Sequence, residues 1–559
     1  MPKLTELPLQ AIAKAQQLAE RGAAELHYAY KMLAAGAFKL EPPQNVAAML
    51  ADIRRWGEFG MIPALNARRT PNRTAIVDDF GEITFAELDE AAHEVANGLL
   101  AMGVKGGDGV AILARNHRWF LVAVYGAARV GARIILLNSE FSGPQIKEVS
   151  EREGAKLVIY DDEYYEAVSK ADPPLGKLRA LGINPDKDEP SGSTDETLED
   201  LVARSSGQPA PKATRHSSII ILTSGTTGTP KGANRSTPPT LAPIGGVLSH
   251  VPFKSGEVTS LPAPMFHALG FLHATIAMML GSTLVLKRRF KPVTVLEDIE
   301  EHGVTAMVVV PVMLSRILDA LDGIERKPNL SSLRIVFVSG SQLGAELATR
   351  ALKELGPVVY NLYGSTEIAF ATIARPKDLS INPATVGPVV KGAKVKILDD
   401  SGNELPQGEV GRIFVGNFFP FEGYTGGGHK QIIDGLMSSG DVGYFDEHGL
   451  LYVSGRDDEM IVSGGENVFP AEVEDLISGH PEVVEATALG VEDKEWGHRL
   501  RAFVVKTEGA SIGEDDIKTY VKDHLARYKV PREVVFLDEL PRNPTGKVLK
   551  RELREIDVD

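Results

Sequence analysis

Cysteine is absent from this chain of 559 residues. Disulfide bonds and cysteine-ligated metal sites are therefore excluded, and so is a thioester formed on the protein itself. Positive charge is also in short supply, because 60 Lys and Arg residues face 75 Asp and Glu residues, a formal charge of −15. Nucleic-acid-binding proteins normally carry a basic surplus. We therefore expect no nucleic-acid partner.

Recognisable targeting segments are missing as well. The N-terminal stretch MPKLTELPLQAIAKAQQ has no compact apolar core and no small-residue cleavage site, and the C-terminal REIDVD carries no lipidation or peroxisomal signal. One uncharged run, 259–286, exceeds the length of a membrane span, but it contains two prolines, two histidines and two glycines. A buried helix followed by a strand explains this run better than a transmembrane helix. These features predict a cytoplasmic enzyme.

Residues 8–40 alternate apolar with charged or polar residues at helical spacing. This pattern predicts a surface helix packed on the body of the protein. Contact with a membrane surface, at the inner face of the membrane, is the alternative. The charges of this segment are mixed in sign, however, where a membrane-surface helix would present a basic face.

A chain of this length is too long for one hydrophobic core, and two to four domains are expected. From residue 74 short apolar strands alternate with helical segments, as in GVAILA, WFLVAVYGAARVG and RIILLN. The alternation predicts parallel sheets covered by helices. It resumes at 217–223, 282–287, 305–311 and 334–340. The intervening stretch 184–216 is polar and rich in Pro and Ser, and it predicts a surface excursion around one short helical piece.

Beyond residue 380 the chain changes to short strands with frequent glycine turns, typical of a hairpin-rich β subdomain. A compact segment with its own αβ pattern follows Arg456. The predicted fold is therefore α/β: a large N-terminal domain of helix-covered sheets with a β-rich subdomain, and a small mobile C-terminal α+β domain. The expected divisions are an N-terminal helical extension at 1–73, the large domain at 74–455, a hinge at 456–458 and the small domain at 459–559.

The least ordinary stretch is ILTSGTTGTPKGA, residues 221–233, in which an apolar strand runs into a loop of Gly, Ser, Thr and one Lys. Backbone N–H groups, hydroxyls and one ammonium suit a polyphosphate. The common phosphate-loop pattern G-x-x-x-x-G-K-[ST] does not fit, because Lys231 follows Pro230 and Gly232 takes the place of Ser or Thr. A loop that holds phosphates here does so in another geometry.

Further candidates follow predicted strands. NLYGSTE, residues 361–367, offers a Tyr, hydroxyls and Glu367, a carboxylate able to hold Mg²⁺ beside phosphate oxygens. In SSGDVGYF, Asp441 stands in a glycine-flanked turn and can accept the hydroxyls of a ribose. In PRNPTGK, Lys547 follows a Pro/Gly turn. Each of these residues taken alone has an ordinary structural explanation.

Taken together, the segments TSGTTGTPKG, YGSTE, SGD, GRDDEMIVSGGENVFPAEVE and PTGK resemble, in order and spacing, the adenylate-forming superfamily of acyl- and aryl-CoA synthetases, adenylation domains and beetle luciferases. The likeness runs from about residue 74 to about residue 552 and is greatest to bacterial fatty-acyl-CoA synthetases. It implies ATP, Mg²⁺ and coenzyme A as cofactors and a small-molecule carboxylic acid as substrate. A chain without cysteine suits a thiol supplied from outside, and a homodimer is left open.

The resemblance assigns roles to residues of this chain. The carboxylate attacks the α-phosphorus of ATP, pyrophosphate leaves, and the thiol of coenzyme A then displaces AMP from the acyl-adenylate. Lys547 bridges the carboxylate and the α-phosphate, Thr366 binds the α-phosphate, Glu367 holds Mg²⁺, and His267 lies near both anions. The remaining implied contacts are with the β- and γ-phosphates (Thr223, Ser224, Gly225, Thr226, Thr227, Gly228 and Lys231), with adenine (Gly340, Ser341, Gln342, Tyr363 and Gly364) and with the ribose (Asp441 and Arg456).

The second half-reaction implies a movement, because Lys547 occupies space that the thiol must enter. Members of the superfamily rotate the small domain about a hinge, which corresponds to Asp458 in this chain. The loop 462–468 then replaces the lysine, and Gly464 shapes the pantetheine tunnel. Such a domain motion is a gating step.

The acid itself is less constrained. Acetate- and propionate-specific relatives carry Trp at the position of Gly364, so the glycine predicts an open pocket, lined by the mostly apolar segments 266–272, 310–314 and 368–371. An apolar tunnel favours a medium- or long-chain fatty acid, and an aryl or sterol-side-chain acid is the alternative. An acyl-AMP ligase that loads a carrier protein, a luciferase-like oxygenase and an inactive nucleotide-binding protein are further alternatives. The carrier-protein ligases usually have an inserted segment for which 364–456 leaves no room.

Overall fold

The computed structural model describes residues 6–39, 41–183, 192–208, 211–223, 231–235, 240–417, 421–425, 430–457, 459, 461–463, 466–493, 497–543 and 546–556. The chain divides into two compact units. Unit 1 holds residues 1–309, 319–336 and 418–429, and unit 2 holds 310–318, 337–417 and 430–559. The predicted hinge at 456–458 lies inside unit 2. The predicted domain limits stay predictions.

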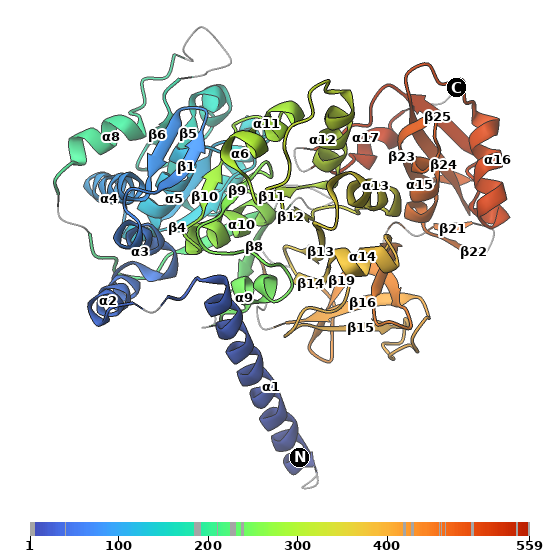
Figure 1. The fold of residues 1–559 in the computed structure, drawn as a ribbon, viewed down its shortest axis with the longest axis horizontal. Coiled ribbons are helices and arrows are strands. Elements are labelled where there is room, and N and C mark those ends of the chain that lie inside the picture. The colour runs from blue at the N-terminus through green and yellow to red at the C-terminus, as the bar shows by residue number, and fades with distance from the viewer. Residues whose placement is uncertain are drawn as a thin grey trace. The chain divides into compact units, whose positions relative to one another are not determined.

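The helices and strands of unit 1 run from blue to green in Figure 1, except β17, which follows much later in the chain. They are α1 (Glu6–Ala35), α2 (Pro43–Gly60), α3 (Ile62–Arg69), β1 (Thr74–Asp78), β2 (Gly81–Thr84), α4 (Phe85–Ala101), β3 (Gly109–Leu113), α5 (Arg118–Val130), β4 (Arg133–Leu136), α6 (Gly143–Arg152), β5 (Ala155–Asp161), α7 (Tyr165–Val168), β6 (Lys177–Leu181), α8 (Leu198–Ser205), β7 (Ser218–Thr223), β8 (Lys231–Arg235), α9 (Ala242–Leu248), β9 (Val258–Ser260), α10 (Ala268–Met279), β10 (Thr283–Val285), α11 (Pro292–His302), β11 (Ala306–Val309) and β17 (Phe421–Tyr424).

Two elements cross the division between the units, and the rest belong to unit 2. The crossing elements are α12 (Pro311–Gly323) and β12 (Ile335–Val338). Unit 2 holds α13 (Ala345–Leu355), β13 (Val359–Ser365), β14 (Ala369–Ala374), α14 (Pro376–Ile381), β15 (Lys394–Leu398), β16 (Gly411–Gly416), β18 (Ile432–Ile433), β19 (Leu436–Phe445), β20 (Leu451–Arg456), β21 (Ile461–Ser463), β22 (Glu466–Val468), α15 (Pro470–Ser478), β23 (Val483–Asp493), β24 (Gly497–Lys506), α16 (Glu514–His524), β25 (Glu533–Leu537) and α17 (Lys550–Arg554).

Unit 1 is built on a seven-stranded sheet of order β17-β8-β7-β4-β3-β5-β6. The strands from β7 to β6 are parallel, and β8 and β17 run antiparallel at one edge. A second set of strands in the order β11-β9-β10-β1-β2 is parallel except for β2. The parallel order reflects the strand–helix alternation, because each parallel crossover carries a helix. The fold-class prediction is confirmed.

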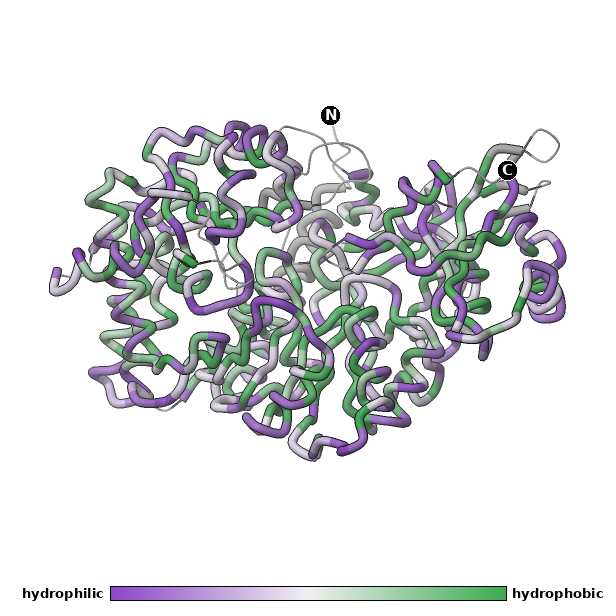
Figure 2. The backbone as a smooth tube through the Cα atoms, turned by 90° about the horizontal axis from the view of Figure 1, so that it is seen from above, coloured by the Kyte–Doolittle hydropathy of each residue, from purple (hydrophilic) through white to green (hydrophobic). Residues whose placement is uncertain are grey.

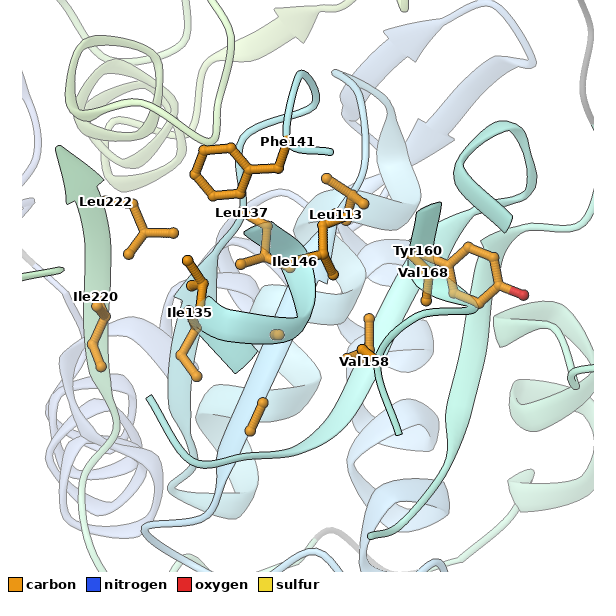
Figure 3. Close-up of a cluster of buried hydrophobic side chains, with 14 residues drawn as sticks. Leu113, Ile135, Leu137, Phe141, Ile146, Val158, Tyr160, Val168, Ile220 and Leu222 are labelled. Carbon is orange, nitrogen blue, oxygen red and sulfur yellow. The ribbon is translucent and has the colours of Figure 1, made fainter. Parts of the chain in front are cut away.

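The core of the seven-stranded sheet is a cluster of side chains from β3, β4, β5 and β7, covered by α6 (Figure 3). Ile135, Val158 and Ile146 are completely buried within it. The ring of Tyr160 lies at its border with the hydroxyl pointing away, and this hydroxyl contacts Ser193 and Asp195 at 2.7 Å each. Hydrophobic and hydrophilic stretches alternate along the chain (Figure 2).

Unit 2 contains two five-stranded sheets and the antiparallel hairpin β13–β14. The first sheet has the order β15-β16-β19-β18 with β20 beside β19, and the second has the order β22-β21-β24-β23 with β25 beside β24. In the second sheet β25 joins β24 in parallel, and α15 and α16 contribute Val473, Ile477, Ile517 and Val521 to its buried core. The predicted change to hairpins beyond residue 380 is confirmed by β15 and β16.

The predicted N-terminal helix is confirmed as α1, and its later half packs on α9. Tyr28 is 1% exposed, and Glu25 accepts hydrogen bonds from the Thr240 hydroxyl and from the Leu241 N–H. The uncharged run 259–286 forms α10 and β10, the predicted helix followed by a strand. None of the described helices is both long enough and apolar enough to cross a bilayer.

The short helical piece predicted within the surface excursion at 184–216 is confirmed. This piece is α8, whose Leu198 and Leu201 are fully buried. Gly98 on α4 lies so close that a Cβ there would be 2.4 Å from Cγ of Leu201. The polar composition of the stretch hid two leucines at i and i+3, which form a short apolar stripe facing α4. The helices α2 and α3 lie within the predicted N-terminal helical extension, and the strand β6 was not predicted.

Candidate functional site

Five of the predicted site residues come together within unit 2. Tyr363 on β13 lies beside Asp441 on β19. The Tyr363 hydroxyl donates to Oδ2 of Asp441 at 2.6 Å. Burial and the neighbouring Asp441 carboxylate raise the pKa of Tyr363 well above its usual value. The phenol therefore stays protonated and acts as a hydrogen-bond donor.

Asp441 and Arg456 face each other across the antiparallel strands β19 and β20. The Arg456 guanidinium donates to Oδ1 of Asp441 at 3.2 Å. The Asp441 N–H donates to the Ser439 hydroxyl at 3.0 Å, and that hydroxyl donates to the Ile413 carbonyl at 3.1 Å. The Asp441 carboxylate thus accepts hydrogen bonds from a phenol and a guanidinium, and the Asp441 backbone is anchored through Ser439 on the neighbouring strand. This pair presents both a carboxylate and a cation at one edge of the sheet.

The turn from β13 to β14 carries Thr366 and Glu367. The Ser365 hydroxyl donates to Oε2 of Glu367 at 2.8 Å. Gly364 pairs with the start of β14 so closely that a Cβ would lie 2.0 Å from the Ala369 carbonyl oxygen. The hairpin itself therefore requires glycine at 364. This backbone requirement means that Gly364 alone is weak support for an open acyl pocket.

Lys547 lies on a tight turn after β25, and the turn is held by its own hydrogen bonds. The Lys547 N–H donates to Oδ1 of Asn543 at 2.9 Å, and the Gly546 N–H donates to the Asn543 carbonyl at 2.8 Å. Lys547 is exposed, but the surrounding protein removes part of its hydration and thereby lowers its pKa, an effect opposed by Glu367. Arg456 also lowers this pKa, while Asp441 and Glu459 raise it. Lys547 is thus within electrostatic reach of Glu367, Asp441 and Arg456.

The predicted adenine segment 340–342 belongs to the same unit. The Ser339 hydroxyl, just before it, donates to the Leu362 carbonyl at 2.9 Å, which ties the segment to β13 beside Tyr363. The Gln342 amide donates to Oδ2 of Asp475 on α15 at 2.8 Å. Burial raises the pKa of Asp475 to about 7, the nearby Glu474 adds to the rise, and the hydrogen bond from Gln342 opposes it. Sequence reasoning missed this Gln342–Asp475 contact because its partners are 133 positions apart.

The phosphate-loop residues lie in unit 1, and most of them fall outside the described residues. These are Ser224, Gly225, Thr226, Thr227 and Gly228, while Thr223 is described through its backbone alone, at the end of β7. Lys231 begins β8, and its ammonium lies 5.7 Å from the ring centroid of Tyr424 on β17. The Gly232 N–H donates to the Thr425 hydroxyl at 2.9 Å. Sequence reasoning missed Tyr424 and Thr425, although their glycine-flanked position in EGYTGG was a usable signal.

His267 is the N-cap residue of α10 in unit 1. Its ring lies 4.4 Å from that of Phe266, centroid to centroid. The preceding loop is held by one buried amide: Asn116 donates to the Leu261 and Ala263 carbonyls at 3.0 Å each and accepts from the Met265 N–H at 2.8 Å. The site residues Asp458 and Gly464 lie outside the described residues.

The donor set around Glu367 fits a magnesium ion that is shared with phosphate. Within the described part of the chain, no group of three or more His, Asp or Glu side chains is arranged to hold a metal by itself. Mg²⁺ characteristically binds one or two carboxylates and completes its octahedron with water and substrate phosphates. A single carboxylate beside a candidate phosphate site is that arrangement. Glu367 would hold the ion, and the ion would neutralise phosphate charge.

Comparison with known proteins matches residues 64–425 to the AMP-binding enzyme family and residues 472–547 to the AMP-binding enzyme C-terminal domain. The chain belongs to this family. It is thus related to the adenylate-forming acyl- and aryl-CoA ligases, a family of acid–thiol ligases that use ATP, Mg²⁺ and coenzyme A. The fold has the large N-terminal and small C-terminal domain of these enzymes.

The relatives act on different acids. A feruloyl-CoA synthase of Amycolatopsis is 33% identical over 507 residues, which cover 89% of this chain and 98% of the relative. A fatty acid–[acyl-carrier-protein] ligase of Streptomyces coeruleorubidus is 30% identical over 512 residues, covering 88% and 95%. Among solved structures, o-succinylbenzoate CoA synthetase of Bacillus subtilis, in complex with its acyl-adenylate intermediate, is 27% identical with a TM-score of 0.74, covering 89% and 98%.

Proposed function

We propose that this protein is an ATP-dependent acyl-CoA synthetase that activates a medium- or long-chain fatty acid. In the first step a carboxylate oxygen attacks the α-phosphorus of ATP, the bond from the α-phosphorus to the α,β-bridging oxygen breaks, and pyrophosphate leaves. In the second step the sulfur of coenzyme A attacks the acyl carbon, the carbon–oxygen bond to AMP breaks, and the thiol proton passes to solvent. The first step brings two anions together and needs positive charge where they meet.

The single observation that carries this proposal is the neighbourhood of Lys547. The Lys547 ammonium interacts electrostatically with Glu367, Asp441 and Arg456. These three residues come from three separate stretches of unit 2. In the proposed reaction Lys547 contacts the substrate carboxylate and the α-phosphate, and Asp441 accepts from the ribose hydroxyls. Thr366 donates to the α-phosphate, and Glu367 carries the magnesium ion. The resemblance implies that His267 and Lys231 also contact the phosphates.

The second step requires Lys547 to leave the acyl-adenylate. We propose that the small domain rotates about Asp458 and that the loop containing Gly464 then faces the thiol. The gating of such a step by a domain motion is common among enzymes with two half-reactions. Because the chain has no cysteine, the acyl group cannot be transferred to a thiol of the protein itself.

The lysine is tested by separating the two half-reactions. Lys547→Ala should lower acyl-adenylate formation, measured by pyrophosphate release, by about 10²–10³-fold, because a positive group that meets developing negative charge is lost. Transfer from supplied acyl-adenylate to coenzyme A should stay near the wild-type rate. Lys522→Ala, on the exposed side of α16, is the control and should change neither rate. Equal losses in both half-reactions would contradict the domain-rotation account.

The acid is tested by a panel scored as coenzyme A-dependent AMP formation. If the acid site is an apolar tunnel, each added methylene contributes about 0.8 kcal/mol, and kcat/KM should rise roughly fourfold per methylene until the chain outgrows the tunnel. The candidate lining is apolar and buried: Val310, Leu314 and Ile368 are 3%, 0% and 3% exposed. A fatty-acid optimum supports the proposal. A preference for an aromatic acid would contradict the proposed fatty-acid specificity.

Two alternatives have specific support. The likeness to a feruloyl-CoA synthase favours an aromatic acid, so cinnamic-type acids belong in the panel. The likeness to a fatty acid–[acyl-carrier-protein] ligase favours a carrier protein as acceptor. Replacing coenzyme A by a phosphopantetheinylated carrier protein distinguishes the acceptors, because a carrier-protein ligase forms adenylate but releases AMP only with the carrier. An inactive nucleotide-binding protein would release no pyrophosphate with any acid.

A further inference from the structure

Lys550 makes two ion pairs at the base of the turn that carries Lys547. It is the first residue of α17, three positions after Lys547. Its ammonium lies 2.7 Å from Oε2 of Glu459 and 3.0 Å from Oε1 of Glu474. The Lys550 side chain is 20% exposed, and the Glu474 side chain is also 20% exposed. A lysine near a chain end is usually solvated, so this double pairing is unexpected from sequence.

The first partner, Glu459, belongs to the segment that leaves the Asp441–Arg456 pair. Glu459 is three residues after Arg456, and its N–H donates to the Arg456 carbonyl at 3.2 Å. Asp457 is fixed as well, because its N–H donates to the Gly440 carbonyl at 2.9 Å and its carboxylate accepts from Arg412 at 3.0 Å. The Lys550–Glu459 pair therefore connects α17 to a segment that is anchored on β19 and β20.

The second partner, Glu474, is fixed by further bonds on α15. Its Oε1 accepts from the Thr487 hydroxyl at 2.8 Å and from the Ala488 N–H at 2.7 Å. Burial alone would lower the pKa of Lys550, but Glu474 and Glu459 outweigh it and raise that pKa. Lys550 is therefore a permanent cation held between two carboxylates, one on the segment after Arg456 and one on α15.

Glu459 is also one of the carboxylates that act on Lys547. An ammonium on a flexible four-carbon stem takes the carboxylate that is available to it. While Glu459 is paired with Lys550, its charge is compensated. With Lys550 uncharged, Glu459 becomes a rival partner for the Lys547 ammonium, and its pull is directed toward the segment after Arg456 and away from the substrate.

We propose that Lys550 is a positioning residue for adenylate formation: by pairing with Glu459 and Glu474 it holds the Lys547 turn against the segment after Arg456 and keeps Glu459 from capturing Lys547. The inference rests on the proposed role of Lys547 in the first half-reaction. Misplacement of a reacting group by about 1 Å is enough to cost roughly a hundredfold in rate. A positioning defect of this kind affects one half-reaction, whereas a damaged fold affects both.

The test uses Lys550→Met, which keeps the length of the side chain and removes its charge. We expect acyl-adenylate formation to fall by about tenfold or more, with transfer from supplied acyl-adenylate to coenzyme A within about twofold of wild type. Lys529→Met is the matched control, since Lys529 makes an analogous ion pair, at 2.6 Å, with Glu472 on α15, the helix that also carries Glu474. The control should leave both half-reactions within about twofold.

A second substitution separates capture of Lys547 from simple loosening. Glu459→Gln added to Lys550→Met removes the rival carboxylate, and we expect it to restore adenylate formation by about threefold or more over Lys550→Met alone. Lys550→Arg keeps the charge and should stay near wild type. If Lys550→Met does not fold, Lys550→Arg and the single Glu459→Gln variant still carry the test, because Glu459→Gln leaves Lys550 paired with Glu474 and should lower adenylate formation only slightly.

The outcomes separate this inference from the proposed function. Loss of adenylate formation in Lys547→Ala, together with no selective loss in Lys550→Met, overturns the role of Lys550 and leaves the proposed function intact. Full activity of Lys547→Ala overturns the proposed function itself. Equal loss of both half-reactions in Lys550→Met also overturns the positioning role, and no recovery on adding Glu459→Gln overturns the capture of Lys547 by Glu459.

Discussion

Gly440 is the residue on which the ribose-site pair depends most directly. Its φ is +83°, and a Cβ there would lie 3.1 Å from both terminal nitrogens of the Arg456 guanidinium. The guanidinium thus packs against bare backbone, and this contact sets the direction from which Arg456 reaches Asp441. Any side chain at 440 has to displace the guanidinium or strain the turn.

Gly440→Ala should therefore raise the KM for ATP by about tenfold or more while the protein still folds. The conformational penalty of a positive φ, about 1 kcal/mol, has to be separated from the contact with Arg456. Gly449→Ala is the control, since Gly449 has φ +72° and no atom within 4 Å of an added Cβ. Steady-state kinetics with ATP varied checks the prediction, and equal KM changes in the two variants would refute it.

Asp475 predicts a pH dependence of stability. Because burial raises its pKa to about 7 in the folded protein, the folded state keeps a proton that the unfolded chain releases between about pH 4 and pH 7. The native protein therefore loses stability as the pH rises through that window, by a few kcal/mol at most, and the full loss is present above pH 7. Above that pH a buried carboxylate is ionised with the Gln342 amide as its donor.

Asp475→Asn removes the ionisation and keeps an oxygen that can accept from Gln342. We expect the variant to exceed the wild type in melting temperature by a larger margin at pH 8 than at pH 5, measured by scanning calorimetry. Asp399→Asn is the contrasting control, because hydrogen bonds from Asn403 lower the pKa of Asp399 and its removal should not stabilise at high pH. An Asp475→Asn effect that is the same at both pH values would show that this carboxyl does not titrate in that window.

At the scale of the elements, the contact between α8 and α4 was not predicted from the sequence. Leu201 fits into the space left by Gly98, and both residues lie in unit 1. The sequence identified α8 as a helical piece but not its partner, because hydrophobic spacing predicts an apolar face without saying which element covers it. The same limit applies to β13 and β20, whose partners bring Tyr363 and Arg456 to Asp441.

A double-mutant cycle tests this packing. Leu201→Ala should destabilise unit 1 by about 2–5 kcal/mol by opening a cavity, and Gly98→Ala should destabilise it through overlap with Leu201. The double variant should lose less than the sum, because the new methyl group occupies the space that Leu201 vacates. Thermal unfolding of the four proteins gives the coupling. Strict additivity would mean that the two helices do not pack as described.

The candidate site was predictable where chemistry is written in a short motif. Glu367, Asp441, Arg456 and Lys547 stand in such motifs, and the structure brings them into one electrostatic neighbourhood. Gln342 was predicted only as an adenine contact, and Lys550 and Asp475 were not predicted, because a lysine and a carboxylate in polar surroundings look like ordinary surface residues. Their roles depend on partners 91 and 133 positions away.

At the scale of the whole molecule, the proposed rotation about Asp458 is testable because the chain has no cysteine. Single cysteines can be introduced without removing any native thiol. Ser401→Cys and Glu508→Cys place labels on exposed positions before and after the predicted hinge. We expect the label-to-label distance, measured by pulsed electron paramagnetic resonance, to differ between the protein with ATP and a non-reacting acid analogue and the protein with AMP and coenzyme A. The same label-to-label distance in both states would contradict the rotation.

The amino-acid sequence by itself determined the α/β class, the family and the order of the catalytic motifs, because strand–helix alternation and glycine-rich loops are local properties of the chain. Only the tertiary structure decided which polar and charged side chains lie close enough to interact. Tyr363 became a donor to Asp441, Lys550 became a half-buried cation between Glu459 and Glu474, and burial raised the pKa of Asp475 to about 7. These outcomes depend on burial and on the distance between remote residues, which no local pattern specifies.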